Sequence, residues 1–278
     1  MQAIVFLAAP FALAVLLVGI HAYLGLHVLE REVIFVDISL SQVAALGSAV
    51  SLFFVHEGEG AGLALTLSLT FCVATSFALA LLKHYEKSVS QEALIGMTYA
   101  LASGALILVA DKLPHGAEHL KEALVGNILF VTWPQVLQTF IIYAVIGVVH
   151  YIFRHQFWRA SRGEAGVFWW DFLFYFLFGI VITFSTKHAG VLVVFSILVA
   201  PAALATRFFP DRKNQLLSRL GLAWMVGTAG LGLSFILSYN LDLPSGASIV
   251  CTLTSLFFLT LLLKRRRISL KNLPKGIS

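Results

Sequence analysis

Charged residues are scarce in this chain. Asp, Glu, Lys and Arg make up 12% of its 278 residues, whereas 59% are hydrophobic. A soluble globular domain is about 25% charged, so the composition excludes that class and indicates an integral membrane protein. The apolar runs are far longer than strands, which predicts an all-α bundle of membrane-spanning helices. No long polar segment is present that would fold alone, so residues 1–278 are expected to form a single transmembrane domain.

Other absences narrow the function. The only two cysteines, Cys72 and Cys251, lie in apolar runs, where cysteine is a small packing residue. No G-x-x-x-x-G-K-[ST] string occurs, nor a G-x-G-x-x-G string opening a helix, so the chain does not bind ATP by those routes. We therefore expect no enzymatic activity, and ATP-driven transport would require a separate ATPase subunit. The N-terminus has no basic segment before its first apolar run, which favours a first transmembrane helix over a cleaved signal.

Nine stretches are each long enough to cross a bilayer as a helix. They comprise residues 3–27, 33–55, 61–82, 91–110, 134–153, 167–185, 189–206, 217–238 and 246–263. An odd number of spans places the two termini on opposite sides of the membrane.

The basic residues orient the bundle. Sixteen of the nineteen lysines and arginines fall on the side of the C-terminus, including those of the basic tail 264–278. The other three are Lys112, Lys121 and Lys187. Because cytoplasmic loops carry the excess of Lys and Arg, the C-terminus is predicted to be cytoplasmic and the N-terminus external. The net charge of +5 thus reflects topology, and it does not indicate nucleic-acid binding.

The loops predicted to be external are rich in imidazole and carboxylate groups. They hold His56, Glu57, Glu59, Asp111, His115, Glu118, His119, Glu122, His188 and Asp242. These side chains suit zinc, manganese or iron. The alternative is that the loops are simply polar.

His115, Glu118 and His119 form the string H-x-x-E-H of some zinc proteases. A protease also needs a third ligand and a water-accessible cleft, which a short loop between two spans hardly provides. Two other interpretations stay open. The loop and His188 accept metal at the outer face, or the loop is an amphipathic surface turn.

Asp37 is the only formal charge in the stretch 33–55. A carboxylate at the centre of a membrane helix costs about 2.5–3.5 kcal/mol on insertion scales, so it normally faces a cavity or a partner. Asp37, Ser41, Ala45 and Ala49 recur every four residues, which places them on one stripe of a helix. The small side chains allow close helix packing or leave room for a path beside Asp37.

Residues 201–213 end one span and become basic and aromatic. This segment includes Arg207, Phe208, Phe209, Pro210 and Asp211. Two phenylalanines followed by charges suit docking into a partner's groove. The alternative is ordinary interfacial aromatics beside positive-inside charges.

Four segments carry a further pattern: residues 25–47, residues 92–96 with 124–129, residues 187–205, and residues 238–250. In this order they are similar to the motifs G…V-L-R…F-x-D-x-x-x-H…G, D-x-x-I-G…L-x-G-D-I-L, K-V-V-G-x-L-L-V…L-I-x-P-A-x-x-A and S-Y…D-x-P-x-G-x-x-I-V. These motifs are those of the permeases of bacterial ABC importers for zinc, manganese and iron, which the chain therefore resembles. They follow the family's order along nearly the whole chain.

This resemblance implies a homodimeric permease of the type II ABC importer kind in the bacterial inner membrane, in contact with membrane lipid. It also implies an ABC ATPase on the cytoplasmic face and an extracytoplasmic metal-binding protein. A divalent metal ion would be the transported substrate, and no permanently bound cofactor is expected. Asp37 would line the path, and residues 207–211 would form the loop that couples to the ATPase.

One departure from the family pattern concerns the metal ligand. The family has histidine four residues after the aspartate, where this chain has Ser41. Counted back from Gly47, Gln42 takes the histidine's place, so the chain carries one extra residue. A π-bulge would absorb that residue and bring Gln42 over Asp37. An oxygen-only site would favour manganese or magnesium over zinc.

Two further functions stay open at this stage. The same architecture would suit a metal chelate or another small solute. A secondary transporter would use Asp37 as its proton or sodium carboxylate, although the inverted repeats common in such carriers are not evident in this sequence.

Overall fold

The computed structural model describes residues 2–54, 61–85, 88–113, 116, 126, 128–164, 168–210 and 215–271, and only the backbone of 2–6, 61 and 263–271. This described part contains ten α-helices, one short 3-10 helix and no strands. The elements are α1 (Gln2–Arg31), α2 (Val36–Ser51), α3 (Ala61–Tyr85), α4 (Gln91–Ala110), η1 (Ile128–Phe130), α6 (Trp133–Ile152), α7 (Arg154–Ser161), α8 (Phe168–Ala189), α9 (Val191–Phe208), α10 (Leu216–Leu241) and α11 (Ser245–Lys271).

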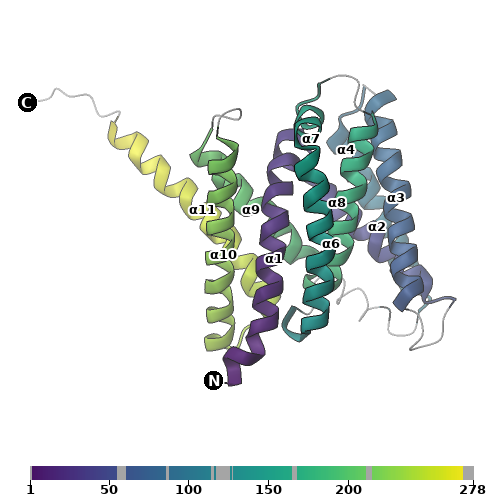
Figure 1. The fold of residues 1–278 in the computed structure, drawn as a ribbon, viewed down its shortest axis with the longest axis horizontal. Helices are drawn as coiled ribbons and strands as arrows, with labels where there is room; N and C mark the ends of the chain where they lie inside the picture. Colours follow the sequence, from purple (N-terminus) through teal and green to yellow (C-terminus); the bar gives the residue numbers. More distant parts are fainter. Residues whose placement is uncertain are drawn as a thin grey trace, which may run out of the picture.

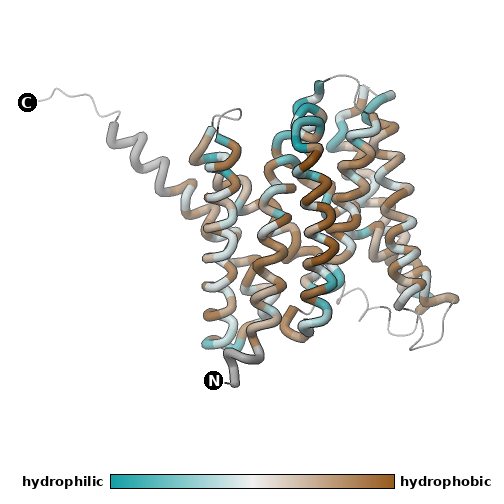
Figure 2. Tube along the Cα trace, in the orientation of Figure 1, coloured by the Kyte–Doolittle hydropathy of each residue, from teal (hydrophilic) through white to brown (hydrophobic). Residues whose placement is uncertain are grey.

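The all-α membrane bundle predicted from the composition is confirmed. Eight helices of the described residues are long and apolar enough to cross a membrane, and α2 is a shorter apolar helix of 16 residues. Together they account for the nine expected spans. α1 begins at one end of the bundle and α11 ends toward the other, as Figure 1 shows. Hydrophobic residues run along the helices, and hydrophilic ones gather toward their ends (Figure 2).

One helix is shorter than expected, and one helix was not expected. α2 begins at Val36 and ends at Ser51, so it is shorter at both ends than the predicted stretch 33–55. α7 lies in a segment that was expected to be a loop. It buries Phe157 and Ala160 while most of its polar residues stay exposed, so it is amphipathic. The segment is short and rich in basic residues, which is why it was not recognised as a helix.

The helices form two groups on either side of α8. α2 packs against α3, α4 and α8, whereas α1 packs against α9 and α10, which in turn pack against α11. α6 contacts both α1 and α8, and α7 lies against α8 and α1. Figure 1 shows this order, with α10 and α11 at one side, α6 and α7 in the middle and α3 at the other side. Among the eight long helices, α8 is the most buried inside the bundle.

Close contacts between helices depend on two glycines. A Cβ atom at Gly25 of α1 would lie 2.1 Å from the carbonyl oxygen of Leu198 in α9. At Gly47 of α2, it would lie 2.7 Å from the carbonyl oxygen of Leu67 in α3. Without a hydrophobic driving force between helices in lipid, such small residues permit the backbone approach that holds a membrane bundle together.

The two ends of the bundle differ in charge. We call the end that carries Arg31, Lys83, Arg154, Arg207 and Arg219 the basic end. There α1, α3, α6 and α9 finish and α8 and α10 begin.

Candidate functional site

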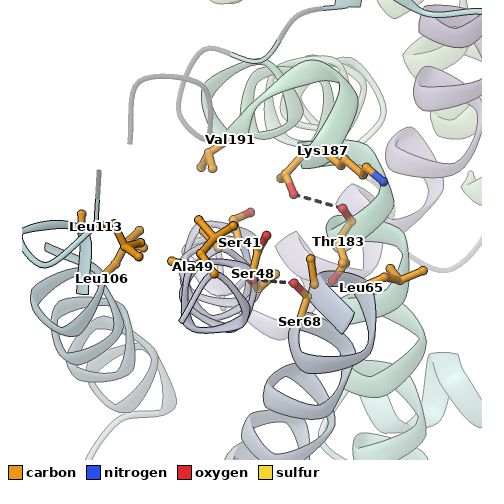
Figure 3. Close-up of a pocket in the computed structure, with 16 residues that line it drawn as sticks. Ser41, Ser48, Ala49, Leu65, Ser68, Leu106, Leu113, Thr183, Lys187 and Val191 are labelled. Atoms are coloured by element: carbon orange, nitrogen blue, oxygen red, sulfur yellow. Dashed lines mark hydrogen bonds between the residues drawn. The ribbon is translucent and has the colours of Figure 1, made fainter. Parts of the chain in front are cut away.

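A cavity of about 340 Å³ lies at the end of the bundle opposite the basic end. It is enclosed by the last turns of α2, α4 and α8 and the first turns of α3 and α9, and Figure 3 shows it in close-up. Its lining residues are Ser41, Ala44, Ala45, Ser48, Ala49, Leu52, Ala64, Leu65, Ser68, Leu106, Ala110, Leu113, Thr183, Thr186, Lys187 and Val191. The polar part of this lining consists of hydroxyl groups and one lysine.

The stripe on α2 faces this cavity. Ser41, Ala45 and Ala49 all line it, so open space lies beside the small side chains of this helix face. Asp37 continues the stripe one turn, about 6 Å, toward the basic end. It does not line the cavity itself. The Asp37 carboxylate therefore lies beyond the inner end of the cavity, toward the basic end, and Ser41 lies between the carboxylate and the cavity.

Asp37 is buried, with 1% of its surface exposed. The backbone amides of Asp37 and Ile38 lie close to its carboxylate. Neither carboxylate oxygen accepts a hydrogen bond of normal geometry from the described residues. Its place in the first turn of α2 lets the helix dipole favour a negative charge. A buried carboxylate without a partner is costly unless it holds a cation or a proton.

A second carboxylate approaches Asp37 from α4. Glu92 accepts a hydrogen bond through Oε1 from the backbone N–H of Phe35, at 3.3 Å, and its charge acts on that of Asp37. Its Oε2 is buried and has no partner among the described residues. Glu92 is not among the site residues predicted from the sequence. It is, like Asp37, the only formal charge in its span, and that observation would have identified it.

The predicted π-bulge in α2 is wrong. The helix is an unbroken α-helix from Val36 to Ser51. Gln42 is buried, but it lies five residues from Asp37 and therefore about 140° round the helix. Ser41 is also buried, and its Oγ has no partner in the described part of the chain. On a regular helix, Ser41 shares the face of Asp37 and Gln42 does not.

The predicted external metal ligands are only partly described. His115, Glu118 and His119 lie outside the described residues, and His188 is buried in the last turn of α8. The described residues contain no group of three or more His, Cys, Asp or Glu side chains that would hold a metal ion. A metal-handling role for these four residues stays a prediction.

The predicted coupling segment follows α9 at the basic end. Phe208 ends the helix and is 57% exposed. The carbonyl oxygen of Phe209 accepts a hydrogen bond from Nε of Arg219 at 2.6 Å, which ties the segment to α10. Arg207 donates through Nη2 to the carbonyl oxygen of Leu261 in α11, at 3.5 Å. Pro210 is exposed, and Asp211 lies outside the described residues.

A buried ion network joins three helices at the basic end. Asp171 of α8 accepts hydrogen bonds through Oδ1 from Arg31 of α1 and, at 2.8 Å, from Lys83 of α3. The Arg31 side chain is only 1% exposed, and its guanidinium lies 4.0 Å from the centre of the Phe174 ring. This network holds the two helix groups to α8.

Comparison with known proteins supports this architecture. The model of the ABC 3 transport family matches residues 3–264. A "Probable metal transport system membrane protein" of Chlamydia muridarum is 23% identical over 256 residues, covering 87% of this chain and 83% of that protein. The manganese transport system membrane protein MntC of Listeria monocytogenes is 26% identical over 201 residues, covering 69% of each chain.

Two solved structures share the fold. A chain of PsaBC from Streptococcus pneumoniae, solved in complex with Fab, aligns with a TM-score of 0.74 at 22% identity, covering 96% of this chain and 95% of that one. An inward-facing ABC transporter assigned to the metal-chelate type aligns with a TM-score of 0.68 at 20% identity, covering 94% and 88%.

Proposed function

The chain belongs to the ABC 3 transport family, and from that premise we propose that it is the membrane-spanning subunit of an importer for a divalent metal cation. Relatives named for metal and manganese transport support this substrate class. Because the chain lacks ATP-binding motifs, ATP hydrolysis belongs to a partner subunit docked at the basic end, near Phe208. A metal-binding protein delivers the ion at the opposite end, and two copies of this chain form the permease.

The relation of Asp37 to the cavity carries the proposal. The cavity gives access along the α2 stripe as far as Ser41, and the next residue on that stripe is a buried carboxylate without a hydrogen bond. A cation that reaches Asp37 supplies the positive charge that compensates the buried carboxylate. The positive-inside rule makes the cavity end external and the basic end cytoplasmic, so the ion passes Asp37 on its way inward.

The ligand chemistry favours a hard ion. Asp37, Glu92 and Ser41 offer carboxylate and hydroxyl oxygens, which suit manganese or magnesium better than zinc. In this proposed site, Asp37 of α2 is partnered by a second carboxylate, Glu92 of α4, and not by Gln42 as the sequence suggested. Binding there is expected to be weak, because an ion that is held tightly does not leave.

Metal accumulation in cells tests the proposal. Asp37→Asn keeps the shape of the side chain and removes its charge, so accumulation of manganese, zinc and iron should fall to background. The matched control is Asp111→Asn, since Asp111 is exposed at the other end of α4 and, among the described residues, forms a surface ion pair with Lys112. If Asp37→Asn cells accumulate every metal normally while the protein is present in the membrane, the assignment of Asp37 to the path is wrong.

The cavity also favours a second candidate, import of a metal chelate or another small solute. A volume of about 340 Å³ exceeds the need of a bare ion and lies in the range of small-molecule pockets, about 300–1,000 Å³. The described residues that line it contribute hydroxyls and one lysine but no carboxylate, which suits a neutral or anionic ligand. Uptake of radiolabelled free manganese, measured with and without a strong chelator, separates the two. Uptake that requires the chelator would support the second candidate.

A further inference from the structure

Three polar aromatic side chains meet inside the basic end of the bundle. They are Tyr23 and His27 of α1 and His150 of α6. The ring centres of His27 and His150 lie 6.2 Å apart, and that of Tyr23 lies 4.7 Å from His27 and 5.4 Å from His150. His27 is completely buried, and His150 is 2% exposed.

Four polar atoms of this cluster have no hydrogen-bond partner among the described residues. They are Oη of Tyr23, Nε2 of His27, and both ring nitrogens of His150. A buried polar group left without a partner costs about 1–3 kcal/mol, so four together indicate a ligand that satisfies them.

The hydrogen bonds around His27 fix its tautomer. Ser161 of α7 donates its one hydroxyl hydrogen to the carbonyl oxygen of Phe157, at 2.9 Å. Its Oγ therefore accepts from Nδ1 of His27, at 2.8 Å. With the proton on Nδ1, Nε2 of His27 carries a lone pair and faces no protein donor. Histidines that bind metals almost always donate their other ring N–H to a partner in this way.

The short helix α7 encloses the cluster. Trp158 stacks on His27 with the ring centres 4.1 Å apart, and Phe157 stacks on His150 at 4.1 Å. Phe174 of α8 contacts both histidine rings from the side of the bundle core. Asp37 belongs to α2, which packs in the other helix group, so this cluster is separate from the proposed path.

The charges nearest the cluster are largely balanced. Arg31 is paired with Asp171, and Arg162 lies 3.7 Å from Glu30. Lys83 shares Asp171, which leaves an excess of one positive charge in this group of five. The cluster itself is neutral, so a cation bound there meets only partial repulsion.

We propose that His27, His150 and Tyr23 form a second cation site, for a divalent transition metal of the kind that imidazole prefers, such as zinc or cobalt. Metal–nitrogen bonds of about 2.0–2.1 Å place the centres of two imidazoles on one tetrahedral ion about 5 Å apart. The rings of His27 and His150, 6.2 Å apart without metal, therefore move about 1 Å closer together when they bind it. Two imidazoles and one phenol are fewer ligands than a permanent zinc site uses, so binding here is reversible. In the orientation proposed above, this site lies on the cytoplasmic side and responds to metal that has already been imported.

Cobalt binding by the purified full-length chain tests this site. The background is Asp37→Asn, which removes the charge of the path site, so the result does not depend on whether the chain transports metal. This protein should bind one Co²⁺ with a visible absorption band, and Zn²⁺ should displace it. His150→Phe should weaken Co²⁺ binding at least tenfold, because it removes one ligand. His155→Phe is the control, since His155 is an exposed histidine of α7 outside the cluster.

The variants are chosen to stay folded. His150 has no hydrogen bond to lose, and phenylalanine keeps the stack on Phe157, so the metal-free variant should unfold at a temperature no lower than the parent. His27→Gln is the second variant, because its amide N–H₂ retains a donor toward Ser161. Zn²⁺ should raise the unfolding temperature of the parent and of His155→Phe but of neither cluster variant. Absence of Co²⁺ binding in the Asp37→Asn background, or binding that neither variant weakens, would overturn the proposal.

Discussion

Ser41 follows Asp37 on the same face of α2, one turn of uninterrupted helix further along the chain. Ser41 lines the inner end of the cavity, and Asp37 lies buried beyond it. In the proposed function, an ion that enters from the cavity therefore meets the hydroxyl of Ser41 first and the carboxylate of Asp37 second.

This geometry predicts which substitution introduces a histidine ligand. Ser41→His places an imidazole one turn from Asp37, where both reach one cation, and imidazole suits zinc. Zinc accumulation relative to manganese should rise about tenfold, which corresponds to about 1.4 kcal/mol. Gln42→His places the imidazole about 140° round the helix from Asp37, so the ratio of zinc to manganese accumulation should not change. Dual-isotope uptake in the same cells measures this ratio, and a rise in Gln42→His alone would contradict the assignment of Ser41 to the face of the path.

Glu92 is predicted to act through its charge. Glu92→Gln keeps an oxygen that accepts from the N–H of Phe35, so the hydrogen bond between α4 and the residue before α2 is retained. If Glu92 is a second carboxylate ligand, this variant should reduce manganese accumulation at least tenfold without lowering the unfolding temperature. Glu32→Gln, a change at an exposed residue between α1 and α2, is the control. Normal transport by Glu92→Gln would show that the charge of Glu92 is not needed and that the residue acts only through its hydrogen bond to Phe35.

Asp171 is predicted to be the most sensitive charge for stability. Asp171→Asn leaves Arg31 and Lys83 without their shared carboxylate, and breaking a buried pair costs about 3–5 kcal/mol. The unfolding temperature of the purified chain should fall by several degrees. Glu164→Gln removes an exposed pair with Arg159 and should change stability by less than about 1 kcal/mol. Equal effects of the two variants would contradict the importance of the buried network.

Gly47 is predicted to be required for the contact between α2 and α3. In Gly47→Ala the new Cβ meets the backbone of Leu67 and Ser68, and such overpacking costs about 1–3 kcal/mol. Gly104→Ala in α4 is the matched control, because nothing lies within 4 Å of its new Cβ. Alanine at that position should stabilise the helix by up to about 1 kcal/mol. Thermal unfolding of both variants gives the comparison, and a Gly47→Ala protein as stable as the parent would show that the helices shift freely.

Much of the fold was predictable because the bilayer acts on local sequence. Span length and hydrophobicity are properties of about 20 consecutive residues, so the eight long spans and the apolar stretch that holds α2 were predictable from the sequence. The cost of a lone charge in such a span is also local, which is why Asp37 was found. α7 was missed because eight residues are too few for an amphipathic pattern to stand out among charges.

The sequence by itself determined the class of protein, the number of spans, the charge asymmetry of its ends and the unusual position of Asp37. Only the tertiary structure decided what each polar group faces. It placed Glu92 beside Asp37, kept α2 regular so that Gln42 turns away, and brought His27 next to His150. These relations depend on how helices far apart in the sequence pack, and on the 100° rotation that each residue adds to a helix, so one residue of register changes which side chains meet.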